Sequence, residues 1–238
     1  MEAEKDQTGM AGADTGLAHE AGDSTLTEDL ALGLLKRGDL TVEEVEQIAK
    51  NSGLMRSRKV RVRVTAHPRT PRRISLRLLR ELYTFDLMRF AMTPTAPADL
   101  KRVADELLVG RLASITLGER ISLARRGSGT VAAALLLAKE ARVWQTALEN
   151  GRLTQAALIR AVLQPQATPA FVQAVCSHTK WSVRPEIRAA LLRSAHTPLA
   201  RALEFARRLT PMQLREVLQA SRMPERVKEA IRKEFDLS

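Results

Sequence analysis

Residues 187–209 read IRAALLRSAHTPLARALEFARRL, and this stretch decides the fold. An apolar run ends in a short polar turn, a Thr-Pro pair closes the turn, and a second apolar run follows. In the second run apolar residues recur three and four positions apart, as at Leu199, Ala202 and Leu203, which places them on one face of an α-helix. The stretch therefore predicts two short amphipathic helices joined by a tight turn.

The Thr-Pro pair recurs along the chain. Five of the ten prolines follow a threonine, and each pair stands before a segment with helical apolar spacing. A threonine hydroxyl can accept a hydrogen bond from an unpaired amide of the first turn, and proline at the first helical position lacks the donor that would go unpaired there. Each pair therefore predicts the start of a helix. The pairs are Thr70-Pro71, Thr93-Pro94, Thr168-Pro169, Thr197-Pro198 and Thr210-Pro211.

Other signals fill most of the remaining chain with helices. Thr41 and Glu44 form a capping-box pattern, which predicts a helix over residues 42–50. The apolar residues Leu100, Val103, Ala104, Leu107 and Leu108 share one face of a further helix. More helices are predicted over residues 117–126, 130–139, 142–149, 154–163, 169–177, 185–193, 211–220 and 225–235. Helices this short are marginal alone, so they must be stabilised by packing on their neighbours.

The composition agrees with an all-α fold. Of the 238 residues 45% are hydrophobic but only 3% are aromatic, so the core must consist mainly of Leu, Ala, Val and Ile. Cys176 is the only cysteine, which excludes an internal disulfide and indicates a reducing, cytoplasmic setting. The longest apolar run, residues 131–138, is too short for a membrane span, and the N-terminus lacks the pattern of a secretion signal. We predict a soluble protein without a membrane partner.

Charge and composition divide the chain into three parts. Residues 1–24 are rich in Gly, Ala, Asp, Glu and Thr without apolar periodicity, which predicts a disordered acidic tail. Residues 1–30 hold eight acidic side chains against Lys5 alone, a net charge of −7, whereas the whole chain has a net charge of +11. We predict an N-terminal helical cap over residues 25–57 and a helical-repeat domain over residues 58–238.

A longer period lies above the helical one. Three stretches begin with a basic residue beside a β-branched one and end in a polar turn closed by a threonine, namely Thr70, Thr154 or Thr197. With Thr116 included, the closing threonines are 46, 38 and 43 residues apart. We therefore predict a repeat of about 42 residues.

This spacing and the order of Val-Arg, turn and Thr-Pro resemble the HEAT and leucine-rich-repeat-variant families of α-helical repeats. The resemblance covers roughly residues 58–221. It rests on Thr70, Pro71, Thr154, Thr197, Pro198 and the Val/Ile-Arg positions before them, whereas Thr154 is followed by Gln155 in place of proline. It implies a right-handed α-solenoid in which repeats pack against their neighbours and present a curved binding surface. The cysteine cluster of some leucine-rich-repeat-variant proteins is absent, so no iron–sulfur site or other cofactor is expected.

One stretch concentrates positive charge. Between residues 56 and 80 there are ten basic side chains and no acidic one, a density that attracts carboxylates or phosphates. We predict a surface for an anionic partner, and the alternative is two solvated helix faces whose arginine stems cover apolar neighbours. Residues 60–64 alternate as a strand would, but the repeat register favours a helix. The ten residues are Arg56, Arg58, Lys59, Arg61, Arg63, Arg69, Arg72, Arg73, Arg77 and Arg80.

The histidines and the cysteine have plain structural interpretations. His67 and His196 occupy equivalent places in turns before Thr-Pro, and this recurrence favours a hydrogen bond to the turn backbone over catalysis. Cys176 and His178 are two potential ligands, whereas zinc needs three or four. Burial as a small residue is the expected role of Cys176.

Aromatic residues and one glycine-rich turn offer further sites. Trp144 and Trp181 could stack on bases, as in a helical-repeat DNA glycosylase, but the aromatic pair and acid of such an enzyme are not apparent. Trp144 follows Val143 in a repeat position, which favours core packing. Residues 125–130 lack the lysine and spacing of a phosphate-binding loop and indicate a turn between helices.

No catalytic, metal-binding or cofactor-binding set of residues accompanies the helices. We therefore predict a non-enzymatic scaffold that binds another protein. The basic stretch favours an acidic protein as this partner. Its surface would combine the groove of successive second helices with the basic stretch of residues 56–80. The second hypothesis is a nucleic-acid binder held by phosphate contacts, and a helical-repeat DNA-repair enzyme comes third.

Overall fold

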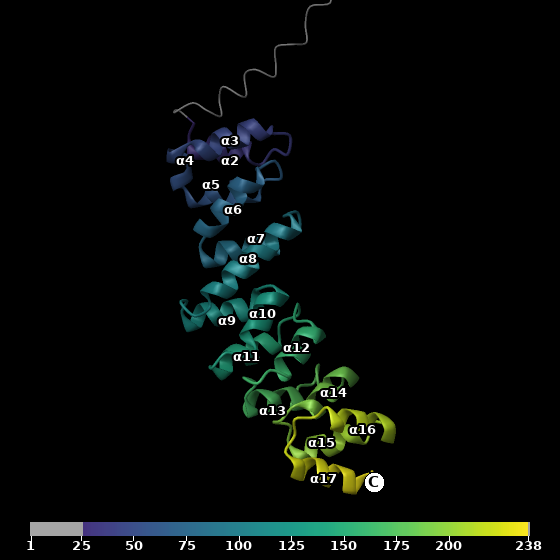
Figure 1. The fold of residues 1–238 in the computed structure, drawn as a ribbon. Coiled ribbons are helices and arrows are strands. Elements are labelled where there is room, and N and C mark those ends of the chain that lie inside the picture. The colour runs from purple at the N-terminus through teal and green to yellow at the C-terminus, as the bar shows by residue number, and fades with distance from the viewer. Residues whose placement is uncertain (1–25, 238) are drawn as a thin grey trace, which may run out of the picture. The chain divides into compact units, whose positions relative to one another are not determined.

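The protein is all-α over the part that the structure describes. The structure is a computed structural model and describes residues 26–237, in which there are sixteen helices and no strand (Figure 1). The all-α class is thus confirmed. The predicted acidic tail, residues 1–24, lies outside the described residues.

The helices form two compact units, the first ending at Arg111 and the second beginning at Leu112. The first contains α2 (Glu28–Leu34), α3 (Val42–Lys50), α4 (Ser52–Arg56), α5 (Arg58–Ala66), α6 (Arg72–Glu81), α7 (Thr84–Met92) and α8 (Ala98–Arg111). The second contains α9 (Leu117–Arg126), α10 (Gly129–Leu135), α11 (Ala141–Leu148), α12 (Gln155–Val162), α13 (Pro169–Ser177), α14 (Pro185–Arg193), α15 (Leu199–Ala206), α16 (Pro211–Gln219) and α17 (Glu225–Glu234). The division into a cap over residues 25–57 and a repeat domain over residues 58–238 stays a prediction.

Local capping fixes several helix ends where the sequence predicted them. The capping box of α3 is formed, because the Thr41 amide donates to the Glu44 carboxylate (2.7 Å) and the Glu44 amide donates to the Thr41 hydroxyl (3.2 Å). The helices predicted over residues 42–50, 117–126, 169–177 and 185–193 have the observed ends. These ends are predictable because a cap is built from residues three apart in sequence.

Two of the five Thr-Pro pairs cap helices as predicted. The Thr168 hydroxyl accepts a hydrogen bond from the Phe171 amide (3.2 Å), and the Thr210 hydroxyl accepts one from the Gln213 amide (3.3 Å). In both helices proline occupies the first turn, where its missing amide costs no hydrogen bond.

In the other three pairs the threonine hydroxyl does not cap a helix, which corrects its predicted role, although helix starts after Thr70-Pro71 and Thr197-Pro198 are confirmed. The hydroxyls of Thr70 and Thr197 donate backwards, to the carbonyl oxygens of Val64 and Leu191, and close the preceding turn. The helix then begins after the proline. Thr93 instead ends α7, and the next helix begins only at residue 98.

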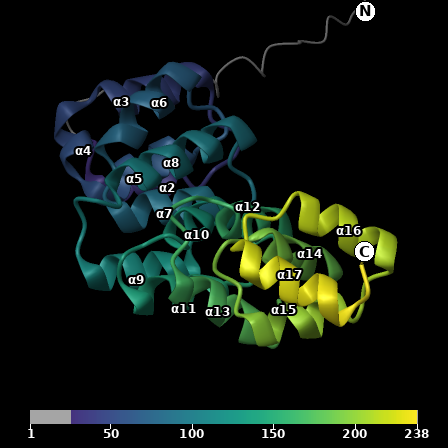
Figure 2. The same cartoon turned by 60° about the horizontal axis from the view of Figure 1, so that its bottom comes forward.

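Helices of the second unit are arranged in two layers. In one layer α9 contacts α11, α11 contacts α13 and α15 contacts α17; in the other α10 contacts α12, α12 contacts α14 and α14 contacts α16. Figure 2 shows the odd-numbered and even-numbered helices of this unit as two rows. Each odd-numbered helix is therefore the first, and the following even-numbered helix the second, of a pair.

The predicted interval of 42 residues is not the period of these pairs. First helices of the second unit begin at residues 117, 141, 169, 199 and 225, so one pair takes 24 to 30 residues. The threonines at positions 70, 116, 154 and 197 precede α6, α9, α12 and α15, which are every third helix of the chain. The threonine interval therefore spans three helices, whereas a pair contains two. The threonine spacing was misleading because threonines precede first and second helices alike: Thr116 caps α9, a first helix, and Thr154 caps α12, a second helix.

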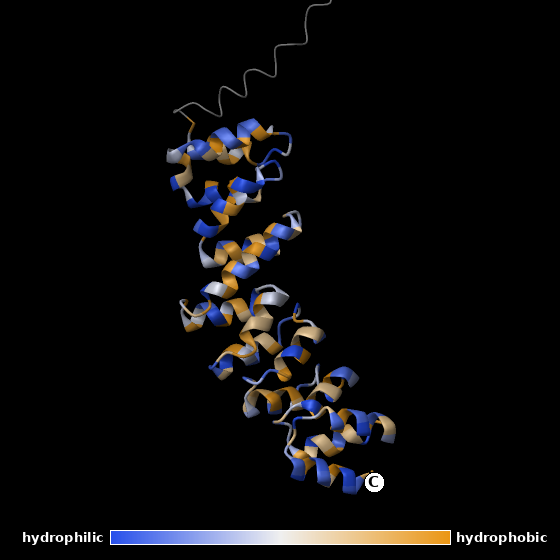
Figure 3. Ribbon diagram, in the orientation of Figure 1, coloured by the Kyte–Doolittle hydropathy of each residue, from blue (hydrophilic) through white to orange (hydrophobic). Residues whose placement is uncertain are grey.

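The first unit has the same layering. α5 contacts α2 and α7 in one layer, and α6 contacts α8 in the other. Val60 and Val64 of α5 lie in one buried cluster with Ile74 and Leu78 of α6, so the hairpin of α5 and α6 shares one core. Figure 3 shows hydrophobic and hydrophilic residues mixed along the helices, and on α5 and α6 buried and exposed positions alternate within each turn. The opposite faces of α5 and α6 consequently meet solvent.

Hydrogen bonds join neighbouring pairs at their turns. The buried His67 ring donates to the Arg37 carbonyl (2.9 Å) and accepts from the Arg69 amide (3.3 Å), which confirms a structural role for this histidine. His196 is exposed, and its backbone amide donates to the Ser194 hydroxyl. The predicted equivalence with His67 was therefore wrong for the side chain, because the His196 ring is not buried in the turn as the His67 ring is. Carbonyl groups at helix ends lack partners within the helix, so such bonds stabilise the stack.

Gly129 permits a close approach between two turns of the second unit. A Cβ atom here would lie 2.4 Å from the carbonyl oxygen of Arg152. We expect Gly129→Ala to lower the free energy of unfolding by about 1–3 kcal/mol, because the backbone would have to move. The measurement is urea unfolding followed by tryptophan fluorescence, since Trp144 and Trp181 both belong to this unit.

Gly118→Ala is the matched control for this prediction. It lies in α9, where a Cβ would meet nothing within 4 Å. Alanine there should leave stability unchanged or raise it by about 0.5–1 kcal/mol through helix propensity. Equal unfolding midpoints for the two variants would contradict the close approach at Gly129.

Candidate functional site

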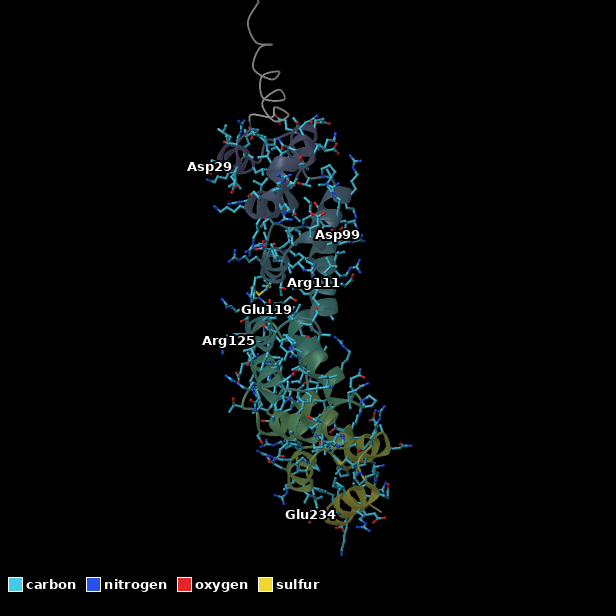
Figure 4. The ribbon with its side chains drawn as sticks, turned by 90° about the vertical axis from the view of Figure 1, so that its left-hand side faces the viewer. Asp29, Asp99, Arg111, Glu119, Arg125 and Glu234 are labelled. Atoms are coloured by element: carbon cyan, nitrogen blue, oxygen red, sulfur yellow. The ribbon has the colours of Figure 1, made fainter. Side chains whose placement is uncertain are left out.

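The ten basic residues predicted as an anionic surface are divided between two surfaces. Val60 of α5 and Ile74 of α6 share one buried cluster, so the exposed faces of the two helices point away from each other. Asp29 of α2, on the α5 side, and Asp99, on the α6 side, lie on opposite edges of the first unit in Figure 4. The α5 face has Arg58, Lys59 and Arg63; the α6 face has Arg72, Arg73, Arg77 and Arg80; Arg56 and Arg69 are exposed outside both, and Arg61 is half-buried.

The α6 face is partly neutralised. Arg72 forms an ion pair with Asp99 of α8, and Arg73 forms one with Glu46 of α3 at 2.6 Å. The other two arginines of this face have no carboxylate partner within residues 26–237. The surface thus has mixed charge, typical of a solvated helix face.

The α5 face borders a hollow of about 800 Å³ between α2, α5 and α7. We name it the α2/α5/α7 groove. Its lining has five basic and two acidic side chains beside an apolar floor. The lining residues are Asp29, Leu32, Gly33, Lys36, Arg58, Lys59, Val62, Arg63, Asp86 and Arg89.

Helical spacing explains why these side chains share the groove. On α5 they follow the spacing i, i+1, i+4, i+5 from Arg58 to Arg63. On α2 they follow i, i+3, i+4, i+7 from Asp29 to Lys36, just beyond the helix end. Both patterns describe one face of a helix. The layer contacts of α2, α5 and α7 then bring the three faces together.

Arg58 lines the groove with a side chain that is held in place by hydrogen bonds. Its Nε and Nη2 atoms donate to the two carboxylate oxygens of Asp86 at 2.7 and 2.9 Å, and Asp86 is buried. The hydrogen bonds to Asp86, together with its charge, raise the pKa of Arg58. The guanidinium also lies 5.1 Å from the centre of the exposed Tyr83 ring. Bidentate geometry and stacking hold this side chain in one position.

Four basic side chains of the groove remain for a ligand. Lys36, Lys59, Arg63 and Arg89 form no ion pair with any residue in the described part of the chain. With Arg58 compensated by Asp86, the four outweigh the single carboxylate of Asp29. A groove with this excess of positive charge and an apolar floor suits an acidic, partly apolar ligand.

Sequence reasoning found only part of this site. It named Arg58, Lys59 and Arg63 but missed Lys36 and Arg89, which stand outside the basic stretch. It also placed the binding groove on second helices, whereas this groove is lined by α2, α5 and α7. Helical spacing on α2 and α7 was the available signal, but their adjacency to α5 is a tertiary property.

The tryptophans belong to the core of the second unit. Trp144 is 6% exposed and Trp181 is 1% exposed, so neither ring is available to stack on a base. The Trp144 ring meets Phe171 edge-on, with centroids 5.8 Å apart. The preference for core packing is therefore confirmed.

The cysteine and the glycine-rich turn also have structural roles. Cys176 is fully buried as expected, and burial raises the pKa of its thiol to about 11. In the turn of residues 125–130, Gly127 ends α9 and the Ser128 hydroxyl accepts from the Val131 amide at 3.2 Å. Across residues 26–237 there is no group of three His, Cys, Asp or Glu side chains that could hold a metal ion.

None of the helices within residues 26–237 combines the length and the apolar character that crossing a membrane requires.

Comparisons with known proteins identify no family. No protein-family model, no curated protein and no solved structure matches the chain.

Proposed function

We propose that this chain is a non-enzymatic helical-repeat scaffold whose first unit binds an acidic segment of another protein in the α2/α5/α7 groove. The observation that carries the proposal is the groove itself, about 800 Å³ in volume with an apolar floor and an excess of basic side chains. Grooves of this kind bind amphipathic helices, which fill the floor with one face and meet the rim with polar groups.

The proposal includes a finer statement about the fold. We propose that each unit is a segment of a right-handed α-solenoid of the HEAT type. Contacts between successive first helices, and between successive second helices, support this. In such an architecture a first-helix layer is a continuous surface, which suits an elongated ligand.

Each part of the groove has a separate task in this proposal. Leu32 and Val62 would bury apolar side chains of the ligand, which supplies most of the binding free energy. Lys59 and Arg63, one turn apart on α5, would pair with carboxylates four residues apart on a ligand helix. Rim charges of this type chiefly raise the association rate and select the partner.

Nucleic-acid binding receives less support. The basic residues of the predicted stretch are divided between two surfaces, and two of the four arginines on α6 are paired with carboxylates. Stacking of bases on Trp144 or Trp181 would require their removal from the core. Nucleic-acid binding, and a DNA-repair activity with it, is therefore the alternative that the binding test below can favour over protein binding.

The test compares charge reversals on two faces. We expect Lys59→Glu/Arg63→Glu to weaken binding of a fluorescein-labelled helical peptide, with glutamates on one face and leucines on the other, by about tenfold or more. Arg77→Glu/Arg80→Glu is the matched control, because it reverses two exposed charges on the opposite face. Fluorescence anisotropy gives both affinities, and a duplex DNA of similar length serves as the second ligand.

A steric variant tests the groove without changing charge. A Cβ at Gly33 would meet nothing within 4 Å, and Gly33 lines the groove, so Gly33→Leu adds bulk to the groove from an open position. This variant should also weaken peptide binding, whereas Gly118→Leu, equally open but in the second unit, should not. Unchanged peptide affinity in both groove variants overturns the proposal. Salt-sensitive DNA binding that exceeds peptide binding would favour the nucleic-acid alternative.

A further inference from the structure

The acidic N-terminal segment of the same chain is chemically suited to the α2/α5/α7 groove. Residues 1–24 contain six acidic side chains and one lysine, a net charge of −5. The groove lining has five basic and two acidic side chains, a net charge of +3. The opposite signs favour contact, and the attraction is strongest at low ionic strength.

The point of attachment lies beside the groove. Residues 1–24 are followed within three residues by α2, and α2 lines the groove from Asp29 to Lys36. Asp29 and Gly33 are separated by roughly 6 Å along the axis of α2, and Lys36 follows two residues beyond the end of this helix. Each extended residue spans up to about 3.3 Å, so Glu20 and Asp23 can reach the basic rim.

We propose that residues 1–24 dock in the α2/α5/α7 groove of their own chain and compete there with the acidic partner. This rests on the preference of the groove for acidic segments that is proposed above. Leu17 and Met10 supply apolar side chains for the floor formed by Leu32 and Val62. A short tether holds the segment at an effective concentration in the millimolar range, so even weak intrinsic affinity gives substantial occupancy.

With competition of this kind, the apparent affinity for a partner equals the affinity of the open groove multiplied by the fraction of chains whose groove is open. An occupancy of roughly two-thirds to nine-tenths would weaken partner binding about three- to tenfold. Neutralising the segment should therefore strengthen binding by the same factor. Raising the salt concentration should reduce the difference between the two chains.

The direct test is zero-length carbodiimide cross-linking of the full chain, followed by mass spectrometry. The reagent joins carboxylates to amines in contact. We expect links from the acidic residues of the N-terminal segment to Lys36 and Lys59, which line the groove. Lys50 of α3 and Lys101 of α8, outside the groove lining, are internal controls. A mixture of isotopically labelled and unlabelled chains shows whether a link is within one chain.

A full-chain variant provides the second measurement. It replaces the six acids by amides: Glu2→Gln, Glu4→Gln, Asp6→Asn, Asp14→Asn, Glu20→Gln and Asp23→Asn. This variant should bind the acidic peptide about three- to tenfold more tightly than the natural chain. Exchanging each of these glutamates for aspartate, and each aspartate for glutamate, keeps the charge and should leave the affinity unchanged.

The outcomes separate this inference from the proposed function. Links to Lys50 and Lys101 as frequent as those to Lys36 and Lys59, or links joining two chains, would overturn self-docking. So would unchanged peptide affinity after neutralisation. If the groove variants still weaken peptide binding in that case, the proposed function stands without self-docking. Loss of both effects removes the two proposals together.

Discussion

Replacing Trp181 by alanine should lower the free energy of unfolding of the second unit by about 3–5 kcal/mol. The side chain is 1% exposed, and its indole N–H donates to the Leu148 carbonyl at 2.9 Å. Lys180 and Arg184 lie over the ring, with their charged groups 4.4 and 5.1 Å from its centre. The substitution therefore removes core packing, a hydrogen bond between neighbouring helix pairs and two cation–π contacts at once.

Urea unfolding, followed by far-UV circular dichroism and by Trp144 fluorescence, measures this loss. Trp181→Phe keeps an aromatic ring but leaves the Leu148 carbonyl without its donor, so its loss should be intermediate. Val183→Ala is a control of nearby position, because Val183 is 58% exposed and its truncation should change stability by about 0.5 kcal/mol or less. Similar shifts for Trp181→Ala and Val183→Ala would show that the ring does not hold adjacent pairs together.

Asn150→Ala should cost about 3 kcal/mol, the second large effect. Asn150 is 1% exposed, and its Nδ2 donates to the carbonyls of Ala124 (2.8 Å) and Gly127 (3.2 Å). Its Oδ1 accepts from the Arg152 amide at 2.8 Å. Alanine leaves the two buried carbonyl groups and the partly buried Arg152 amide without this partner, and a buried group left unsatisfied is costly. Gln145→Ala, at an exposed position of α11, the helix that precedes Asn150, should be nearly neutral.

Asn150→Asp makes the same prediction depend on pH. The carboxylate has nearly the shape of the amide, but it faces the carbonyl oxygens of Ala124 and Gly127 with an acceptor instead of a donor. Burial beside these oxygens should raise the pKa of the new carboxyl group in the folded state above its unfolded value of about 3.9. The variant should thus be least stable at neutral pH and recover, relative to the natural chain, as the carboxyl protonates at acidic pH. A loss that is independent of pH would argue against the assigned hydrogen bonds.

Helix ends were predictable wherever their cause was local. Thr41 and Glu44 satisfy each other's backbone amides, so the sequence of one turn is sufficient to place the start of α3. The role of Thr70 was not predictable in this way, because its hydroxyl donates to Val64, in the preceding helix. The choice between capping forwards and bonding backwards depends on the path of the turn, which the residue pair does not specify.

The candidate site was predicted only where charge is contiguous in sequence. A basic stretch that crosses a helical hairpin is divided by the hairpin, because α5 and α6 turn their apolar faces toward one core. Lys59 and Arg77 therefore belong to different surfaces, although both lie in the predicted stretch. Lys36 and Arg89 lie 23 and 30 residues from Lys59 in the sequence, and the contacts of α2 and α7 with α5 bring all three to one groove. Such long-range adjacency has no local signal.

The only cysteine of the chain should resist oxidation as long as the chain is folded, because its thiol is buried. Cys176 is wholly enclosed, and with a pKa of about 11 it has almost no thiolate at neutral pH. Thiolate is the species that attacks disulfides and peroxides. Covalent dimers linked through sulfur would therefore require that the second unit first opens, so their appearance in a stored sample would report damage to the fold.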